Sequence, residues 1–226
     1  MDDVSERLDA RTSWFGPRLQ SAMIAVLIGL IASPFGAGAA ESVVVTTNTY
    51  AVTGSNLAEL QASIAKNRPW KASEGFEGRT VSSIKCRYSM RAEPGQLWLS
   101  GLEVNTYIVV TVPAWRAPTN ADPAFRAYWA QFVRGLLQHE EGHVQIARAA
   151  AVEVRHRLLA LPASGSPEAL ESAAQQTLKA VLDEFHRKET DYDRRTRHGT
   201  TAYNVVADLT NRPSQGPKQE PKTQGR

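Results

Sequence analysis

The stretch that decides the fold is HEEGH, residues 139–143, within a helix-like segment from Asp122 to about residue 160. Asp122 followed by Pro123 is a strong helix start, and Pro162 stops the pattern. Apolar residues recur every three or four positions and form one stripe: Phe125, Trp129, Phe132, Leu136, Ala147, Ala150, Val154 and Leu158. His139 and His143 fall in the same stripe, so we predict that both imidazoles lie on the buried face of a long helix.

Two histidines four positions apart lie one helical turn apart on one face, so both can reach the same zinc ion. Glu140 would then point at the open side of the metal, as in the His-Glu-x-x-His pattern of zinc peptidases. Glu141 departs from this pattern, because zinc peptidases usually carry an uncharged residue there. The alternative interpretation is a hydrogen-bonded polar patch in a helix that holds no metal.

The helical pattern would span about 58 Å if unbroken, so we expect a bend or a break at Gly135 or Gly142. A second helix begins at Ser166-Pro167, and the short link between the two predicts an antiparallel hairpin. In an antiparallel hairpin, a residue lies opposite the one that is equally far from the middle of the link on the other helix. Residues 184–188 are therefore expected opposite the two histidines. A catalytic zinc normally takes three protein ligands, and this geometry allows three candidates for the third: Glu184, His186 and Glu189.

The first half of the chain favours strands. The β-branched runs 43–45 and 50–52 predict an entry strand pair. Asn56 with Glu59 predicts a capped helix through Leu57, Leu60 and Ile64 that ends at residues 67–69. Ile84, Cys86, Tyr88 and Met90 alternate with polar residues, and a turn at 93–95 leads to a strand over residues 98–112. We therefore expect an α+β fold, an antiparallel sheet followed by a helical hairpin that carries the zinc motif, similar in plan to zincin peptidases.

Residues 1–40 are typical of an export segment. Three arginines precede an apolar run over residues 22–32, and small residues follow at 37–40. The run is shorter than the roughly 20 apolar residues of a membrane span. We expect a cleaved signal peptide or, as the alternative, an uncleaved N-terminal anchor. The protein would be exported to the periplasm or the extracellular space, with membrane contact only through an uncleaved leader.

The chain has 226 residues, 42% of them hydrophobic, which is enough to bury a core. We place one domain at residues 41–207 and a disordered tail at residues 208–226, where proline, glycine, glutamine and lysine dominate. The formal net charge of +3 gives no reason to expect a nucleic-acid partner. The single cysteine, Cys86, excludes a disulfide within the chain, and we expect it to be a small buried residue.

Four features occur together: the export segment, a Pro-x-Trp element at 113–115, the 139–143 motif, and a Tyr-Asp-x-x-Thr-x-His-Gly element at 192–199. In this combination, over about residues 42–205, the chain resembles the bacterial proteins grouped as domain of unknown function 922, described as predicted secreted zinc-dependent proteases. The alternative for the octapeptide is a charged helix end capped by Gly199.

The resemblance makes His198 the first choice for the third zinc ligand and Asp193 the second, although Asp193 could instead support a ligating histidine. Tyr192 or Tyr203 could supply an oxyanion donor. The expected activity is zinc-dependent hydrolysis of peptide or protein substrates in the cell envelope, with Glu140 as general base. The rival hypotheses are a non-catalytic envelope binding module with a structural zinc and a metal-free interaction domain.

Overall fold

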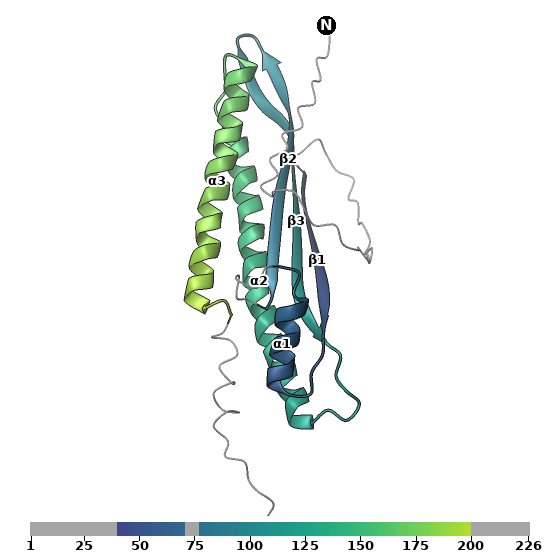
Figure 1. Cartoon of the computed structure of the whole chain (residues 1–226). Helices are drawn as coiled ribbons and strands as arrows, with labels where there is room; N and C mark the ends of the chain where they lie inside the picture. The colour runs from purple at the N-terminus through teal and green to yellow at the C-terminus, as the bar shows by residue number, and fades with distance from the viewer. Residues whose placement is uncertain (1–39, 71–76, 200–226) are drawn as a thin grey trace, which may run out of the picture.

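The computed structural model describes residues 40–70 and 77–199. Its elements, in chain order, are β1 (Ala40–Val52), α1 (Leu57–Asn67), β2 (Arg79–Glu93), β3 (Gln96–Trp115), α2 (Pro123–Leu159) and α3 (Pro167–Thr196) (Figure 1). The fold is α+β, as predicted, with one three-stranded sheet in the order β1-β3-β2. The predicted leader up to residue 39, the predicted tail and Tyr203 lie outside the described residues.

The β2–β3 hairpin forms as the alternation predicts. The strands pair antiparallel and are joined by Pro94-Gly95, where Gly95 has a φ of 78°, a conformation that glycine adopts without steric cost. On β2 the side chains of Ile84 and Cys86 are buried, and the inward position of Cys86 is thereby confirmed. Burial raises the pKa of the Cys86 thiol to about 11, which makes it a poor nucleophile at neutral pH.

The prediction of an antiparallel sheet is wrong for β1. Residues 40–52 form a single strand instead of a pair, and this strand runs parallel to β3. The sheet is therefore mixed. A parallel pair needs a crossover connection, and here α1 and β2 lie between the two partners in the chain. Asn56 caps α1 as expected, because its side chain accepts a hydrogen bond from the backbone N–H of Glu59.

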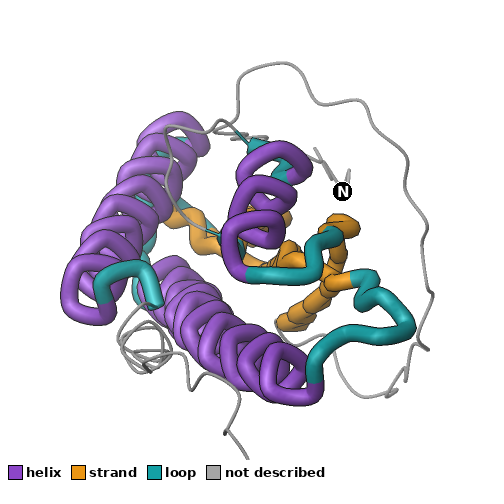
Figure 2. The backbone as a smooth tube through the Cα atoms, turned by 60° about the horizontal axis from the view of Figure 1, so that its bottom comes forward, coloured by secondary structure: helices purple, strands orange, loops and turns teal. Residues whose placement is uncertain are grey.

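The helices pack against one face of the sheet. Even-numbered residues of β3 from Leu102 to Val112 point to this face and are buried, together with apolar residues of α1, α2 and α3. Figure 2, with the lower end of the molecule turned forward, shows the three helices around the strands. On the other face Val44 and Tyr107 remain 48% and 43% exposed, so the described residues leave that side uncovered.

Helix α2 is one continuous helix of 37 residues, so the expected break at Gly135 or Gly142 is wrong. Helix α3 runs back beside it (Figure 1). The link between them is not a tight turn, because Ser164 pairs with Leu97 at the β2–β3 hairpin through two backbone hydrogen bonds of 2.9 Å. Within residues 40–70 and 77–199, no helix is long and apolar enough to cross a membrane.

Candidate metal centre

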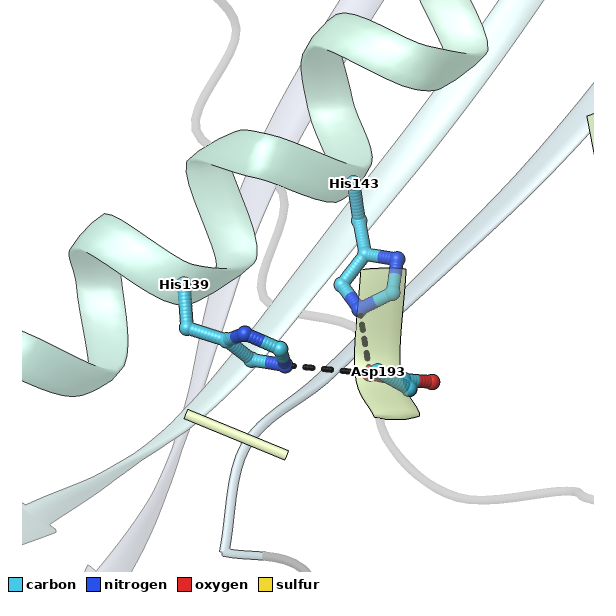
Figure 3. A group of neighbouring side chains, drawn as sticks. All are labelled: His139, His143 and Asp193. Carbon is cyan, nitrogen blue, oxygen red and sulfur yellow. Dashed lines mark hydrogen bonds and ion pairs between the residues drawn. The ribbon is translucent and has the colours of Figure 1, made fainter. Parts of the chain in front are cut away.

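Three side chains from the two long helices meet at one point. On α2, Nε2 of His139 lies 3.2 Å and Nε2 of His143 lies 3.0 Å from the same atom, Oδ1 of Asp193 on α3. Figure 3 shows both rings turned toward the carboxylate. His139 and His143 are only 6% and 9% exposed, which confirms the prediction that the histidines lie on the buried face. The structure thus brings Asp193, the second-choice ligand, to the two histidines.

These donors fit a metal ion. In a tetrahedral zinc site with bonds of about 2.0–2.1 Å, neighbouring donor atoms are about 3.3 Å apart. The separations of 3.2 and 3.0 Å from Asp193 are close to that edge length, and all three donor atoms lie within 4.8 Å of one another. Two imidazole nitrogens and one carboxylate oxygen suit zinc and other divalent first-row metals, so this group could hold any of several such ions.

The charges around this point favour a cation. Burial raises the pKa of Asp193, but hydrogen bonds from His139 and His143 outweigh that effect and hold its pKa well below the usual range. Burial lowers the pKa of His143, yet its hydrogen bond with Asp193 and the nearby Glu140 raise it overall. The carboxylate is therefore ionised, and a positive charge between the three groups, a proton or a metal ion, is favourable.

Glu140 is 3% exposed and is held at the edge of this cluster by the start of β2. Thr80 donates a hydrogen bond of 2.6 Å to Oε2 of Glu140. Gly78 leaves room for the other oxygen, since a Cβ on that glycine would lie 2.5 Å from Oε1. Burial raises the pKa of Glu140, and the Thr80 hydroxyl lowers it in part. A carboxylate with a raised pKa is a better proton acceptor than an exposed one.

Glu141, the residue that departs from the zinc-peptidase pattern, points away from the cluster. It is exposed, and its carboxylate accepts a hydrogen bond from Gln145 one turn further along α2. Its charge is therefore compatible with the site. The two adjacent glutamates thus lie in opposite environments, one buried beside the histidines and one in solvent.

Tyr192 packs against the histidine pair instead of facing the open site. Its ring is stacked on His139 at 5.1 Å between ring centroids, and its hydroxyl donates a 3.1 Å hydrogen bond to the backbone carbonyl of His139. The ring occupies the notch at Gly142, where an added Cβ would lie 2.1 Å from the hydroxyl oxygen. This placement favours a role in positioning the two histidines over the expected role of oxyanion donor.

His198, the first choice for the third ligand, lies near the group but outside it. Arg197 and His198 both have left-handed backbone conformations, with φ of 50° and 52°, and this turn brings His198 back over the end of α3. Its Nδ1 is 3.6 Å from Oδ1 of Asp193, and its side chain is 57% exposed. Non-glycine residues rarely adopt this conformation, so two in succession mark an unusual chain end beside the site.

The candidates from the hairpin reflection lie elsewhere. Glu184 points away and pairs with Arg157 and Lys188. His186 and Glu189 line a pocket of about 180 Å³ that also contains the two histidines, Glu140 and Asp193. Neither belongs to the three-residue donor group that is found among the described residues.

Two threonines in contact with the site were given no role from the sequence, although one of them belongs to the 192–199 element. Thr80 contacts Glu140 from β2, and Thr196 lies on α3 with its hydroxyl oxygen 3.2 Å from Nδ1 of His139. Thr196 stands at the threonine of the Tyr-Asp-x-x-Thr-x-His-Gly element, a signal that was visible in the sequence. Thr80 stands in a strand of otherwise unremarkable polar residues, where only the packing of β2 on α2 identifies it.

Comparisons with curated proteins and with solved structures give no match to this chain. The sequence model of one family, described as bacterial protein of unknown function (DUF922), matches residues 47–199. This range holds residues 47–52 of β1, both long helices, the three metal-binding candidates, Glu140 and the whole 192–199 element. The match covers more than half of the chain, and the protein therefore belongs to the DUF922 family of bacterial proteins.

Proposed function

We propose that the protein is a zinc-dependent peptidase whose metal is held by His139, His143 and Asp193, in a zincin-like plan with the metal-binding helix packed on a sheet. The observation that carries the proposal is the placement of Glu140 beside those three donors, buried and held by Thr80. A buried carboxylate beside the donors, with one oxygen not engaged by Thr80, is the group that a metal-activated water needs as its proton acceptor.

The chemistry divides between the ion and the chain. A bound zinc ion lowers the pKa of water toward neutrality and polarises a scissile carbonyl. Oε2 of Glu140 already accepts a hydrogen bond from Thr80, so Oε1 is the atom that takes the water proton and later passes it to the leaving amine. Tyr192 holds the ring of His139 from α3, and Asp193 on the same helix completes the donor set.

The test compares two neighbouring glutamates in the full chain. Glu140→Gln should retain the metal, measured by elemental analysis, and lose at least about 100-fold in turnover of a mixed peptide library followed by mass spectrometry. Glu141→Gln is the matched control, because Glu141 faces solvent and its loss should leave turnover unchanged. The proposal fails if Glu140→Gln keeps its activity, if a chelator has no effect on turnover, or if the resident metal is iron.

A second candidate is a binding module with a structural zinc, favoured by the position of His198 3.6 Å from Asp193. A structural site has four protein ligands, whereas a catalytic site keeps one position for water. X-ray absorption of the zinc-loaded protein separates the two by the number of imidazoles. Three imidazoles together with no turnover would support the binding module, and two imidazoles support the peptidase.

We also propose that the protein acts outside the cytoplasm on peptides or proteins of the cell envelope. The proposal depends on the charged start, short apolar run and small residues of the first 40 positions. Fractionation of cells that express the full chain should recover it in the periplasm, the medium or the inner membrane. Recovery in the cytoplasm alone would contradict this location.

A further inference from the structure

His139 is in contact with a threonine hydroxyl that has no role in the proposed peptidase mechanism. Thr196, one turn beyond Tyr192 on α3, places its Oγ1 3.2 Å from Nδ1 of His139. The same hydroxyl lies 2.8 Å from the backbone carbonyl oxygen of Tyr192. A threonine hydroxyl has only one proton to donate, so the two contacts cannot both be donated by Thr196.

The carbonyl partner decides the direction of both bonds. A carbonyl oxygen can only accept, so the Thr196 proton goes to Tyr192, the shorter of the two contacts. Thr196 must then accept at its other contact, and the donor is an N–H on Nδ1 of His139. With the proton on Nδ1, Nε2 keeps a lone pair for a metal ion held between His139 and Asp193, whose facing atoms lie 3.2 Å apart. Without a metal, the same Nε2 donates a hydrogen bond to the Asp193 carboxylate.

We propose that Thr196 is a positioning residue that holds His139 in the tautomer with Nδ1 protonated and so presents its Nε2 lone pair to the metal. This inference builds on the proposed metal site. It also explains the spacing of the Tyr-Asp-x-x-Thr element, because one turn of α3 supplies Tyr192 on the ring face, Asp193 at Nε2 and Thr196 at Nδ1. Three neighbouring contacts thus fix the ring on three sides.

The chain offers a matched control for this hydroxyl. Thr190, on the same helix, also donates to the carbonyl four residues earlier, that of His186, at 3.0 Å. Within residues 40–70 and 77–199, the Thr190 hydroxyl makes no hydrogen bond to a histidine ring nitrogen. Replacing either threonine by valine keeps the branched shape and removes the hydroxyl. A difference between the two variants therefore reports the contact with His139 and not the loss of a helix hydrogen bond.

The first measurement is zinc affinity by competition with a chromophoric chelator. Thr196→Val should weaken binding by about 10- to 100-fold, the usual effect of losing a hydrogen-bond partner of a metal ligand. Thr196→Ser should restore affinity to within about threefold, and Thr190→Val should not change it. Thr196→Val binding as tightly as the wild type would overturn the proposal, as would Thr190→Val weakening binding equally.

The second measurement is nitrogen NMR of the zinc-loaded full chain, in which the metal occupies Nε2 of His139. The proton on Nδ1 of His139 should be protected from exchange with water, and Thr196→Val should lose this protection while Thr190→Val keeps it. A wild-type Nδ1 proton that exchanges freely in the zinc-loaded chain would refute the role of Thr196 even if the variant fails to fold, and it would leave the metal site standing. Absence of zinc binding by the wild type would instead refute the proposed peptidase together with this inference.

Discussion

Gly142 lies where a side chain on α2 would enter the volume of the Tyr192 ring. An alanine Cβ at this position would lie 2.1 Å from the Tyr192 hydroxyl oxygen and 2.2 Å from the adjacent ring carbon. The ring cannot easily retreat, because it is stacked on His139 and its hydroxyl is bonded to the His139 carbonyl. The contact between the long helices at the site thus depends on the lack of a side chain at one position.

Gly142→Ala should therefore lower the free energy of unfolding by about 1–3 kcal/mol, as overpacked sites do. Helix propensity alone predicts the opposite sign, a gain of about 1 kcal/mol from replacing glycine by alanine within a helix. Urea unfolding measures the difference. Gly165→Ala is the control, because nothing lies within 4 Å of an added Cβ there, and it should be neutral. A stabilised Gly142→Ala would show that Tyr192 is not packed in this notch.

Thr106 is a polar residue in the apolar interior of the sheet. Its side chain is fully buried, and its hydroxyl oxygen has no hydrogen-bond partner within the described part of the chain. Thr106→Val should raise the free energy of unfolding by about 1–2 kcal/mol, since it removes an unsatisfied buried hydroxyl at nearly constant shape. Thr47→Val on the exposed strand β1 should change stability by less than about 0.5 kcal/mol in the same urea titration. A destabilised Thr106→Val would reveal a partner for the hydroxyl.

An apolar contact and ion pairs join the two long helices along their length. These two kinds of contact contribute differently to the free energy of unfolding. Val181 on α3 is fully buried with Leu178, Phe185 and residues of α2. Arg157 on α2 pairs with Glu153 and, across the helices, with Glu184, but all three side chains are about one-third exposed. Partly exposed ion pairs gain little over their hydrated state, so the apolar contact dominates.

Val181→Ala should lower the free energy of unfolding by about 2–3 kcal/mol through lost burial and the cavity that remains. Arg157→Met keeps the aliphatic stem of the side chain and should cost clearly less. Both variants can be compared by urea unfolding at low and high salt, where only the loss in Arg157→Met should depend on salt. Equal losses in the two variants would mean that the ion pairs hold the helices together as strongly as the core.

The sequence predicted where helices and strands lie better than it predicted which strands pair and in which direction. Helix caps at Asn56, Asp122 and Ser166, and the alternation in β2 and β3, are local signals, and the structure confirms them. The direction of β1 is not a local property. Its partner β3 lies beyond α1 and β2 in the chain, and short β-branched runs look the same in parallel and antiparallel sheets.

The third member of the candidate metal group, Asp193, likewise could not be placed from local sequence signals alone. Reflection through a tight link predicts a partner near residue 185 for the histidine pair, whereas the structure places Asp193 there. The difference arises because Ser164 is tied to Leu97 on the β2–β3 hairpin, so α3 starts further along the sheet than a tight turn would allow. The family resemblance offered Asp193 as its second candidate after His198, and the structure places Asp193 beside the two histidines. This candidate depends on a motif and not on the path of the link.

For the whole molecule, metal binding at the proposed site would be coupled to folding, because the three donors come from two helices. A ligand that binds only the folded state stabilises it by about 2.7 kcal/mol at a free concentration 100 times its Kd. Zinc should therefore raise the unfolding temperature of the full chain, and a chelator should reverse the gain. His143→Gln should abolish this response, and His156→Gln, on an exposed position of the same helix, should preserve it. An unfolding temperature that does not depend on zinc would rule out this site.

Fifty residues separate His143 from Asp193, and the order in which a ribosome delivers them has a consequence. A growing chain presents both imidazoles long before the carboxylate that completes the trio, so every nascent or prematurely terminated product shorter than 193 residues lacks the full set. If the finished protein cuts peptides, its unfinished forms are harmless to the machinery that synthesises them.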